Sequence, residues 1–140
     1  MSFHEAFVAA RKDFGLADNP RGEGATPESL LSAWEEFANR CESGFDGYLD
    51  EYYNLLGVRS VLFGMLNSPR LIGYPEIVEV AYRTVQADRR VVACFDMDEH
   101  PDIERSGISD GTAWYWNHFP RIRSRRFAEE LRRHYGLQGH

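Results

Sequence analysis

The sequence predicts an all-α protein, a small bundle of about five or six helices joined by loops. Apolar residues recur at helical spacing through most of the chain, and helix-start and helix-stop residues bound these stretches. Hydrophobic residues make up 43% and aromatic residues 14% of the sequence, which is enough to form a buried core. The 140 residues fall within the usual size of one domain. Residues 1–140 are therefore expected to form a single helical domain.

The first helix is expected to begin at Ser2. Ser2 and Glu5 have the spacing of a capping box, in which each side chain bonds the backbone of the other residue. The apolar side chains that follow at helical spacing are Phe3, Phe7, Ala10 and Phe14. Gly15 is a helix stop, and residues 16–25 have the composition of a loop.

The second helix is predicted from Thr26 to about Gly44. Thr26 provides the N-cap, Pro27 suits the first helical position, and Glu28 faces the positive end of the helix dipole. The buried face consists of Leu30, Trp34, Phe37 and Cys41. The acids Glu28, Glu35 and Glu42 lie on the opposite side of the helix.

The stretch from Tyr48 to Leu66 is interpreted as two short helices with a break over residues 54–57. Gly57 interrupts the apolar repeat at this point, and residues 67–69 (Asn-Ser-Pro) end the second helix. Arg59 lies within an apolar run and needs an anionic partner if it is buried. Asp50 or Glu51, across the predicted break, is the expected partner in a structural salt bridge.

Pro75 and Glu76 open another helix. Its expected apolar face consists of Ile77, Val80, Ala81, Val85 and Val92. Residues 90–95 also fit a short strand, because they include a β-branched run, but the register from Ile77 favours continuation of the helix. Turn residues then predict a long loop over residues 96–119. The rings of Trp114, Tyr115, Trp116 and Phe119 are expected to pin this loop onto the helices.

The last helix is predicted from Pro120 or Arg121 to Tyr135. Its apolar seam consists of Phe127, Leu131 and Tyr135. Gly136 follows the last periodic residue and is expected to act as the C-cap.

Charge and cysteine content limit the functional classes. The formal net charge of −6 disfavours general binding to nucleic acid or to an anionic membrane. Two cysteines, Cys41 and Cys94, lie in apolar patterns and are expected to be buried, reduced thiols. The sequence has no apolar run long enough to cross a membrane and no secretory signal. We therefore expect a cytoplasmic protein.

The sequence predicts no catalytic residue, metal ligand or cofactor. Its five histidines do not form any of the short motifs that bind zinc, and Cys41 lies on a buried face. The densest group of possible ligands is the acidic loop from Asp96 to Glu104, with His100 within it and His118 beyond it. An alternative hypothesis is therefore a small enzyme or metal-binding protein that uses this loop.

Charge is unevenly distributed along the chain. Residues 28–58 contain seven acids and one arginine, −7 + 1 = −6, whereas residues 120–136 contain six arginines and two acids, +6 − 2 = +4. The two segments form two solvated helix faces, or they pair with each other inside the folded chain, or they are binding surfaces for partner molecules. An acidic face beside exposed tyrosine suits a basic protein. Arginines between Arg121 and Arg133 suit nucleic acid, which the overall charge makes a less favoured alternative.

The predicted protein-binding residues are the acids and the most exposed tyrosine of the first segment. They are Glu35, Glu36, Glu42, Asp50, Glu51 and Tyr53. Three tyrosines within six residues, Tyr48, Tyr52 and Tyr53, cannot all point into one core. At least one is expected to be exposed, and Tyr53 is the one predicted.

Residues 30–66 contain a pattern of residues that resembles a pattern in a known class of proteins. The pattern consists of Trp34 and Phe37, followed by Gly47-Tyr48, Glu51-Tyr52, Asn54, Leu56 and Val58-Arg59. It resembles small acidic all-helical bacterial proteins of the toxin-immunity type. The resemblance implies an immunity or inhibitor protein that blocks a basic toxin or effector, and it supplies no active-site residues to carry over to this chain.

Overall fold

The computed structural model describes residues 1–14, 16, 24–96 and 118–136. The helices within these residues are α1 (Phe3–Ala10), the 3₁₀ helix η1 (Arg11–Phe14), α3 (Pro27–Ser43), α4 (Leu49–Leu66), α5 (Glu76–Cys94) and α6 (Arg125–Tyr135). No strand occurs in these ranges, and the only β pairing there is two isolated bridges. The all-α prediction is confirmed.

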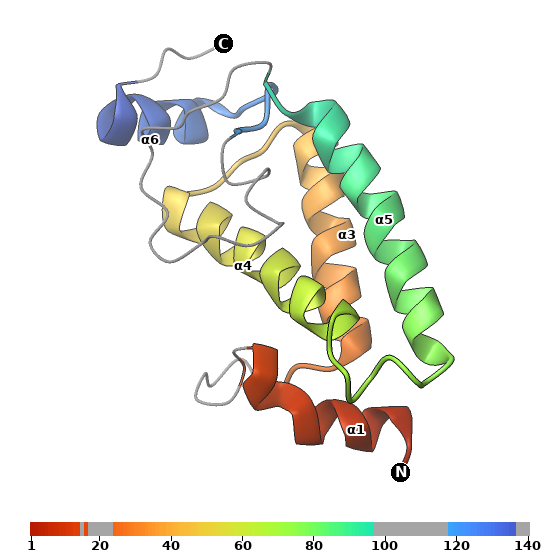
Figure 1. Cartoon of the computed structure of the whole chain (residues 1–140). Coiled ribbons are helices and arrows are strands. Elements are labelled where there is room, and N and C mark those ends of the chain that lie inside the picture. Colours follow the sequence, from red (N-terminus) through yellow and green to blue (C-terminus); the bar gives the residue numbers. More distant parts are fainter. Residues whose placement is uncertain (15, 17–23, 97–117, 137–140) are drawn as a thin grey trace.

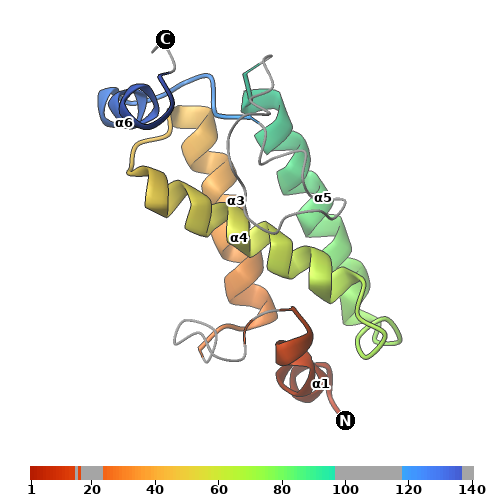
Figure 2. The same ribbon diagram turned by 60° about the vertical axis from the view of Figure 1, so that its left-hand side comes forward.

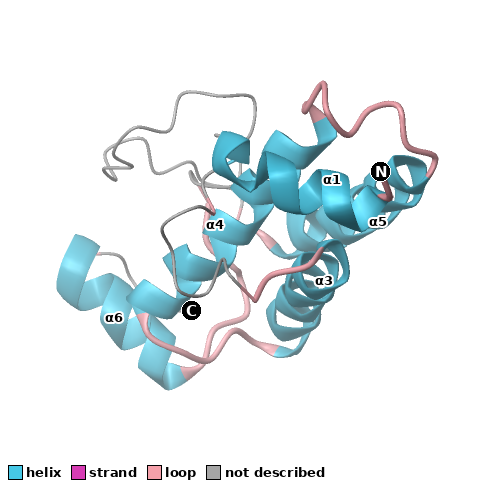
Figure 3. Cartoon of the chain, turned by 90° about the horizontal axis from the view of Figure 1, so that it is seen from below, coloured by secondary structure: helices cyan, strands magenta, loops and turns pink. Residues whose placement is uncertain are grey.

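Helices α3, α4 and α5 form the body of the molecule. Helix α3 packs against both α4 and α5 and stands between them in Figure 1. Helix α4 crosses α3 obliquely, as the rotated view shows (Figure 2). Helix α1 lies across one end of this body, which is seen from below in Figure 3, and α6 lies at the other end.

The predicted helix starts at Ser2 and Thr26 are confirmed. Ser2 Oγ accepts a hydrogen bond from the Glu5 amide at 3.1 Å, and the Glu5 carboxylate accepts one from the Ser2 amide at 3.1 Å. Thr26 makes the same reciprocal pair with Ser29 rather than with an acid, at 3.0 and 2.8 Å. Both helices therefore begin where local cap residues satisfy amides that the helix leaves unpaired.

Aromatic rings fill the core between α3, α4 and α6. Trp34 and Phe37 of α3 stack with their centroids 5.0 Å apart. The Tyr52 ring is fully buried and contacts Phe37, Phe45, Phe119, Phe127 and Tyr53. Cys41 and Cys94 are buried, unbridged thiols, as predicted, and burial raises the pKa of Cys41.

The predicted break at residues 54–57 is wrong, because α4 is one continuous helix from Leu49 to Leu66. Gly57 lies within it, and no atom stands within 4 Å of where its Cβ would be. Glycine inside a helix costs about 1 kcal/mol relative to alanine. Burial of the side chains on either side of it exceeds that cost. These buried residues are Leu49, Tyr52, Leu56, Arg59, Leu62 and Met65.

The helical continuation over residues 90–94 is confirmed, since α5 runs to Cys94 and only Phe95 adopts an extended conformation. The predicted apolar face was only partly correct. Val85 and Val92 are 44% and 53% exposed, whereas Ile77 and Val80 are buried. The other buried residues of α5 are Thr84, Ala87, Val91 and Cys94. Thr84 is accepted there because its hydroxyl donates to the Val80 carbonyl at 2.7 Å.

The last helix starts later than predicted, at Arg125, with Ser124 as its N-cap. The preceding residues are instead paired with two earlier segments, through the bridges Phe45–Arg123 and Phe95–Pro120. Gly136 has φ +68 and acts as the C-cap, as predicted. Of the four rings expected to pin the long loop, Phe119 is fully buried. Trp114, Tyr115 and Trp116 lie outside the described residues.

A buried polar cluster joins the three central helices. The Asp88 carboxylate on α5 accepts two hydrogen bonds from Arg59 on α4, at 2.8 and 2.9 Å. It also accepts one from the indole N–H of Trp34 on α3, at 2.9 Å. The prediction that Arg59 pairs with Asp50 or Glu51 is therefore wrong. In an unbroken helix these acids lie about 12 Å or more along the axis from Arg59, beyond reach.

Candidate functional site

A groove between α3 and α4 contains several of the predicted binding residues. Its cavity has a volume of about 520 Å³. The lining residues are Ala33, Tyr48, Asp50, Glu51, Asn54, Leu55 and Val58. We call this surface the α3–α4 groove. Its apolar side chains, Ala33, Leu55 and Val58, are partly buried, whereas Asp50, Glu51 and Asn54 are exposed beside them.

Tyr48 stands at the start of α4, at one end of the groove. Its side chain is exposed, with 56% of the residue accessible, and the Arg126 guanidinium of α6 lies 5.1 Å from its ring centroid. Asp50 and Glu51 occupy the first turn of α4, where the helix dipole favours negative charge. The groove thus combines an accessible aromatic ring with carboxylates.

Helix α6 holds the N-terminus of α4 in place. Tyr48 is the N-cap residue of α4, but its side chain makes no capping hydrogen bond. The carboxylate of Glu130 on α6 accepts from the Leu49 amide instead, at 3.1 Å. This hydrogen bond lowers the pKa of Glu130, as does the nearby Arg133. A side chain 81 residues away in sequence therefore caps the helix that carries the groove.

Arg40 of α3 fixes the first turn of α4 from the other side. Its guanidinium pairs with Glu51 at 2.5 Å, donates to the Asp46 carbonyl, and lies 4.5 Å from the Phe45 ring centroid. Gly47 leaves room for this pairing. A Cβ at position 47 would lie 3.1 Å from both the Arg40 and the Glu51 side-chain ends. Arg40 therefore links α3 to the first turn of α4, and a side chain at position 47 would crowd this pairing.

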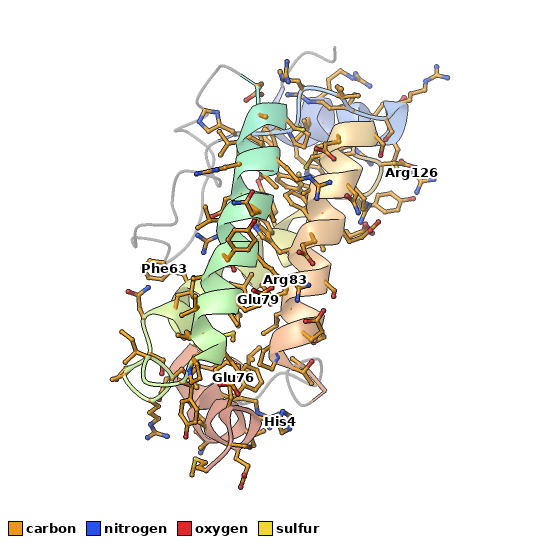
Figure 4. All side chains as sticks on the ribbon, turned by 90° about the vertical axis from the view of Figure 1, so that its right-hand side faces the viewer. His4, Phe63, Glu76, Glu79, Arg83 and Arg126 are labelled. Carbon is orange, nitrogen blue, oxygen red and sulfur yellow. The ribbon has the colours of Figure 1, made fainter. Side chains whose placement is uncertain are left out.

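Glu35 and Glu42 are not on the groove, because they form ion pairs with α5. Arg83 contacts Glu28 at 2.5 Å and Glu35 at 2.6 Å, and Arg90 contacts Glu42 at 2.5 Å. Arg83 lies between α5 and α3 in Figure 4. Hydrogen bonding to Arg90 lowers the pKa of Glu42. These acids therefore support the packing of α3 on α5, and their charge is already matched within the chain.

A repeat in the sequence could have revealed this ladder of ion pairs. Glu28, Glu35 and Glu42 recur every seven residues, and so do Arg83 and Arg90. Matching seven-residue repeats of opposite charge are typical of two helices packed side by side. The arginines that match the acidic helix come from α5, not from the basic segment 120–136.

Tyr53 is not the exposed tyrosine, contrary to the prediction. It is partly buried against the core, and its hydroxyl lies 2.6 Å from the hydroxyl of Tyr135 on α6. Tyr52 is buried and donates to the His118 carbonyl at 2.9 Å. Tyr48 takes the exposed position, because it precedes the first turn of α4 and its backbone is extended.

Three predicted residues remain beside the groove: Glu36, Asp50 and Glu51. Glu36 follows Ala33 by three residues and therefore shares its face of α3. It accepts a hydrogen bond from Asn39 at 3.1 Å. Neither Glu36 nor Asp50 makes an ion pair with any residue that the structure describes. With Arg40 included, the local formal charge is −3 + 1 = −2.

The acidic loop from Asp96 to Glu104 lies outside the described residues, except for Asp96, and so does His100. The Asp96 carboxylate pairs with Arg123 at 2.8 Å and lies 3.5 Å from His118 Nδ1. In the described ranges no group of three or more histidine, cysteine or acidic side chains could hold a metal ion. Through its ion pair with Arg123, Asp96 links the residues that follow α5 to the segment that precedes α6.

Several of the arginines between Arg121 and Arg133 form hydrogen bonds or ion pairs with other residues of the chain. Arg121 donates to the Ala93 carbonyl at 2.5 Å, Arg123 pairs with Asp96, and Arg133 pairs with Glu130 at 2.7 Å. Arg125 and Arg126 have side chains 95% and 54% exposed. The segment does not present all six arginines on one surface.

A second cavity, of about 370 Å³, lies where α1 meets the first turns of α3 and α5. His4, Glu76, Glu79 and Arg83 are among its lining residues. Figure 4 shows His4 and Glu76 toward the lower end of the molecule, with Glu79 and Arg83 farther up. None of the predicted binding residues lines this cavity.

Comparisons with protein-family models, with curated proteins and with solved structures found no match to this chain. The resemblance to toxin-immunity proteins accordingly stays a prediction. No helix among the described residues is both long and apolar enough to cross a membrane.

Proposed function

We propose that this chain is a non-enzymatic protein-binding module of the immunity or inhibitor type. In this proposal it binds a basic toxin or effector along the α3–α4 groove and blocks it by steric and electrostatic means. The observation that carries the proposal is a groove lined by apolar side chains and by Asp50, with Glu36 about one helical turn from the lining residue Ala33. Neither carboxylate has an ionic partner among the described residues. Such groups are available to a cationic partner.

The binding mode follows from the chemistry of the groove. Tyr48 offers a ring with an accessible face, and tyrosine is enriched among residues that contribute most to interfaces. Leu55 and Val58 offer apolar contact area. The carboxylates of Glu36, Asp50 and Glu51 would attract a lysine- or arginine-bearing segment and raise its association rate. Glu35 and Glu42, already paired with arginines, would contribute to the field but not to direct contact.

The proposal includes a bacterial source and a cytoplasmic location. The two buried, unbridged cysteines support a reducing compartment, because thiols persist there. An inhibitor that must neutralise a toxin inside its own cell would be expected in that compartment.

The test compares two charge-reversal variants as bait in pull-downs from the native host. Glu36→Lys with Asp50→Lys alters the groove, and Glu129→Lys alters an exposed acid on α6, whose side chain is 58% exposed. We expect wild type and Glu129→Lys to retain a basic partner. The groove variant should bind it about tenfold more weakly at low salt. Circular dichroism checks that both variants remain folded.

Recovery of wild-type protein without a partner would contradict the proposal. So would a partner that binds the folded groove variant and wild type with equal affinity. If the affinity of wild type does not fall as salt is raised, the electrostatic part of the mechanism is wrong.

A further inference from the structure

Helix α5 carries a second apolar stripe on the side that faces away from its buried residues. Four large side chains there are exposed: Val78 (68%), Tyr82 (61%), Val85 (44%) and Val92 (53%). At 100° per residue they fall within an arc of about 80°, and Arg89 lies inside the same arc. Helix α5 forms one edge of the bundle in Figures 1 and 2. We call these five residues the outer stripe.

The outer stripe is symmetric about Val85. Val78 and Val92 lie seven residues before and after it, about 10 Å away along the axis in each direction. Tyr82 lies three residues before Val85, and Arg89 lies four residues after it. A two-fold axis at Val85 would therefore place Val78 against Val92 of a second copy, and Tyr82 against Arg89. Interfaces between identical subunits require this kind of self-match.

The polar members of the stripe favour the antiparallel arrangement. Within the part of the chain that the structure describes, Arg89 makes no ion pair and the Tyr82 hydroxyl makes no hydrogen bond. Antiparallel pairing would bring each Arg89 guanidinium opposite a Tyr82 ring of the other copy, where a favourable cation–π contact can form. Parallel pairing would place Arg89 against Arg89, and like charges repel at that distance.

We propose that the outer stripe is the interface of an antiparallel, two-fold homodimer. One helix stripe from each copy would bury about 1,000 Å² in total, at the low end for specific interfaces. The dimer is therefore expected to be weak, with a dissociation constant in the micromolar range. The α3–α4 groove lies on the other side of α3 from α5, so both copies would keep their grooves open.

The first test is sedimentation velocity over a range from low micromolar to near millimolar protein. Wild type should shift from monomer to dimer, and Val85→Arg should stay monomeric, with its dimer affinity at least about tenfold weaker. Val8→Arg on α1 is the matched control, because Val8 is 45% exposed and Val85 is 44% exposed. A wild type that is monomeric at every concentration would overturn the proposal. So would a folded Val85→Arg variant that dimerises like wild type.

The second test measures orientation by disulfide formation under mild oxidation. Val85→Cys should form a covalent dimer, because the two copies of this residue meet at the axis. Val92→Cys should not, because its two copies would lie about 21 Å apart. A mixture of Val78→Cys and Val92→Cys should form the mixed dimer. Wild type is the control, since Cys41 and Cys94 are buried. Cross-linking of Val92→Cys but not Val85→Cys would refute the antiparallel arrangement.

Discussion

Replacement of Asp88 by alanine should destabilise the protein by about 3 kcal/mol. The Asp88 carboxylate accepts three hydrogen bonds, two from Arg59 and one from Trp34, at 2.8 to 2.9 Å. The side chains of Arg59 and Asp88 are 10% and 16% exposed. Removal of one member of a buried pair costs about 3–5 kcal/mol, because the other charge stays buried without a partner. Because both side chains keep some exposure to solvent, the expected cost lies near the lower end of this range.

The assay is urea unfolding followed by far-ultraviolet circular dichroism and by tryptophan fluorescence. Asp88→Asn keeps an acceptor oxygen but loses the charge, so we expect an intermediate loss of about 1–2 kcal/mol. Asp13→Ala is the control. Its carboxylate lies 3.5 Å from Arg70, and these side chains are 48% and 58% exposed. A pair this exposed should contribute at most about 0.5 kcal/mol.

A double variant separates the buried charge from simple loss of packing. Arg59→Met with Asp88→Leu removes both charges and keeps apolar volume, so it should be more stable than Asp88→Ala alone. The reasoning fails if Asp88→Ala costs less than about 1 kcal/mol. It also fails if the double variant is no more stable than the single one. Either result would mean that the Arg59 guanidinium finds water or another acceptor.

Two further predictions use α4 and the ion pairs of α3. Gly57→Ala should stabilise the protein by about 0.5–1 kcal/mol, because nothing lies within 4 Å of the new Cβ. Gly64→Ala should destabilise it by about 1–2 kcal/mol, because its Cβ would lie 2.4 Å from that of Phe14. Thermal unfolding measures both changes in stability. If both variants shift the midpoint in the same direction, the prediction is wrong. The lowered pKa of Glu42 adds stability that is complete above its unfolded pKa, near 4.5, and is lost as pH falls through the folded value. Urea midpoints measured from neutral pH to about pH 3 should therefore fall more steeply for wild type than for Glu42→Gln, and equal slopes would refute this.

The helix starts at Ser2 and Thr26 could be predicted from the sequence, because a capping box is a local interaction within four residues. The break at Gly57 was predicted for an equally local reason, and it was wrong. The preference of glycine against helix is about 1 kcal/mol, whereas burial of a side chain such as Leu56 or Leu62 contributes about 1.5–3 kcal/mol. Packing against residues distant in sequence therefore keeps α4 helical through Gly57. A signal confined to neighbouring residues could not reveal that packing.

The face of α5 illustrates a different limit. Its sequence has apolar residues on both sides of the helix, so periodicity alone could not tell which valines face the core. The structure buries Val80 and Val91, next to α3, and exposes Val85 and Val92. The polar Thr84 is buried with the first pair because its hydroxyl bonds the chain itself. A polar residue at a buried position shifted the apparent phase of the repeat.

The candidate site shows why charge counts along the sequence do not describe a surface. Glu35 and Glu42 belong to the most acidic segment, yet arginines 48 residues away neutralise them. In the basic segment, Arg123 has a side chain only 2% exposed, paired with Asp96. In the same segment, Glu130 is occupied by the Leu49 amide, which it caps at the start of α4.

Each of these pairings depends on how two distant helices are aligned, and the alignment is set by the apolar core. Among the described residues Glu36 and Asp50 make no ion pair, and neither do Glu76 and Glu79 at the start of α5. Only Glu36 and Asp50 lie beside the α3–α4 groove, where the proposed basic partner would supply the missing cation. Only half of the predicted binding residues, Glu36, Asp50 and Glu51, therefore lie beside the groove, and their binding to a basic partner stays a prediction.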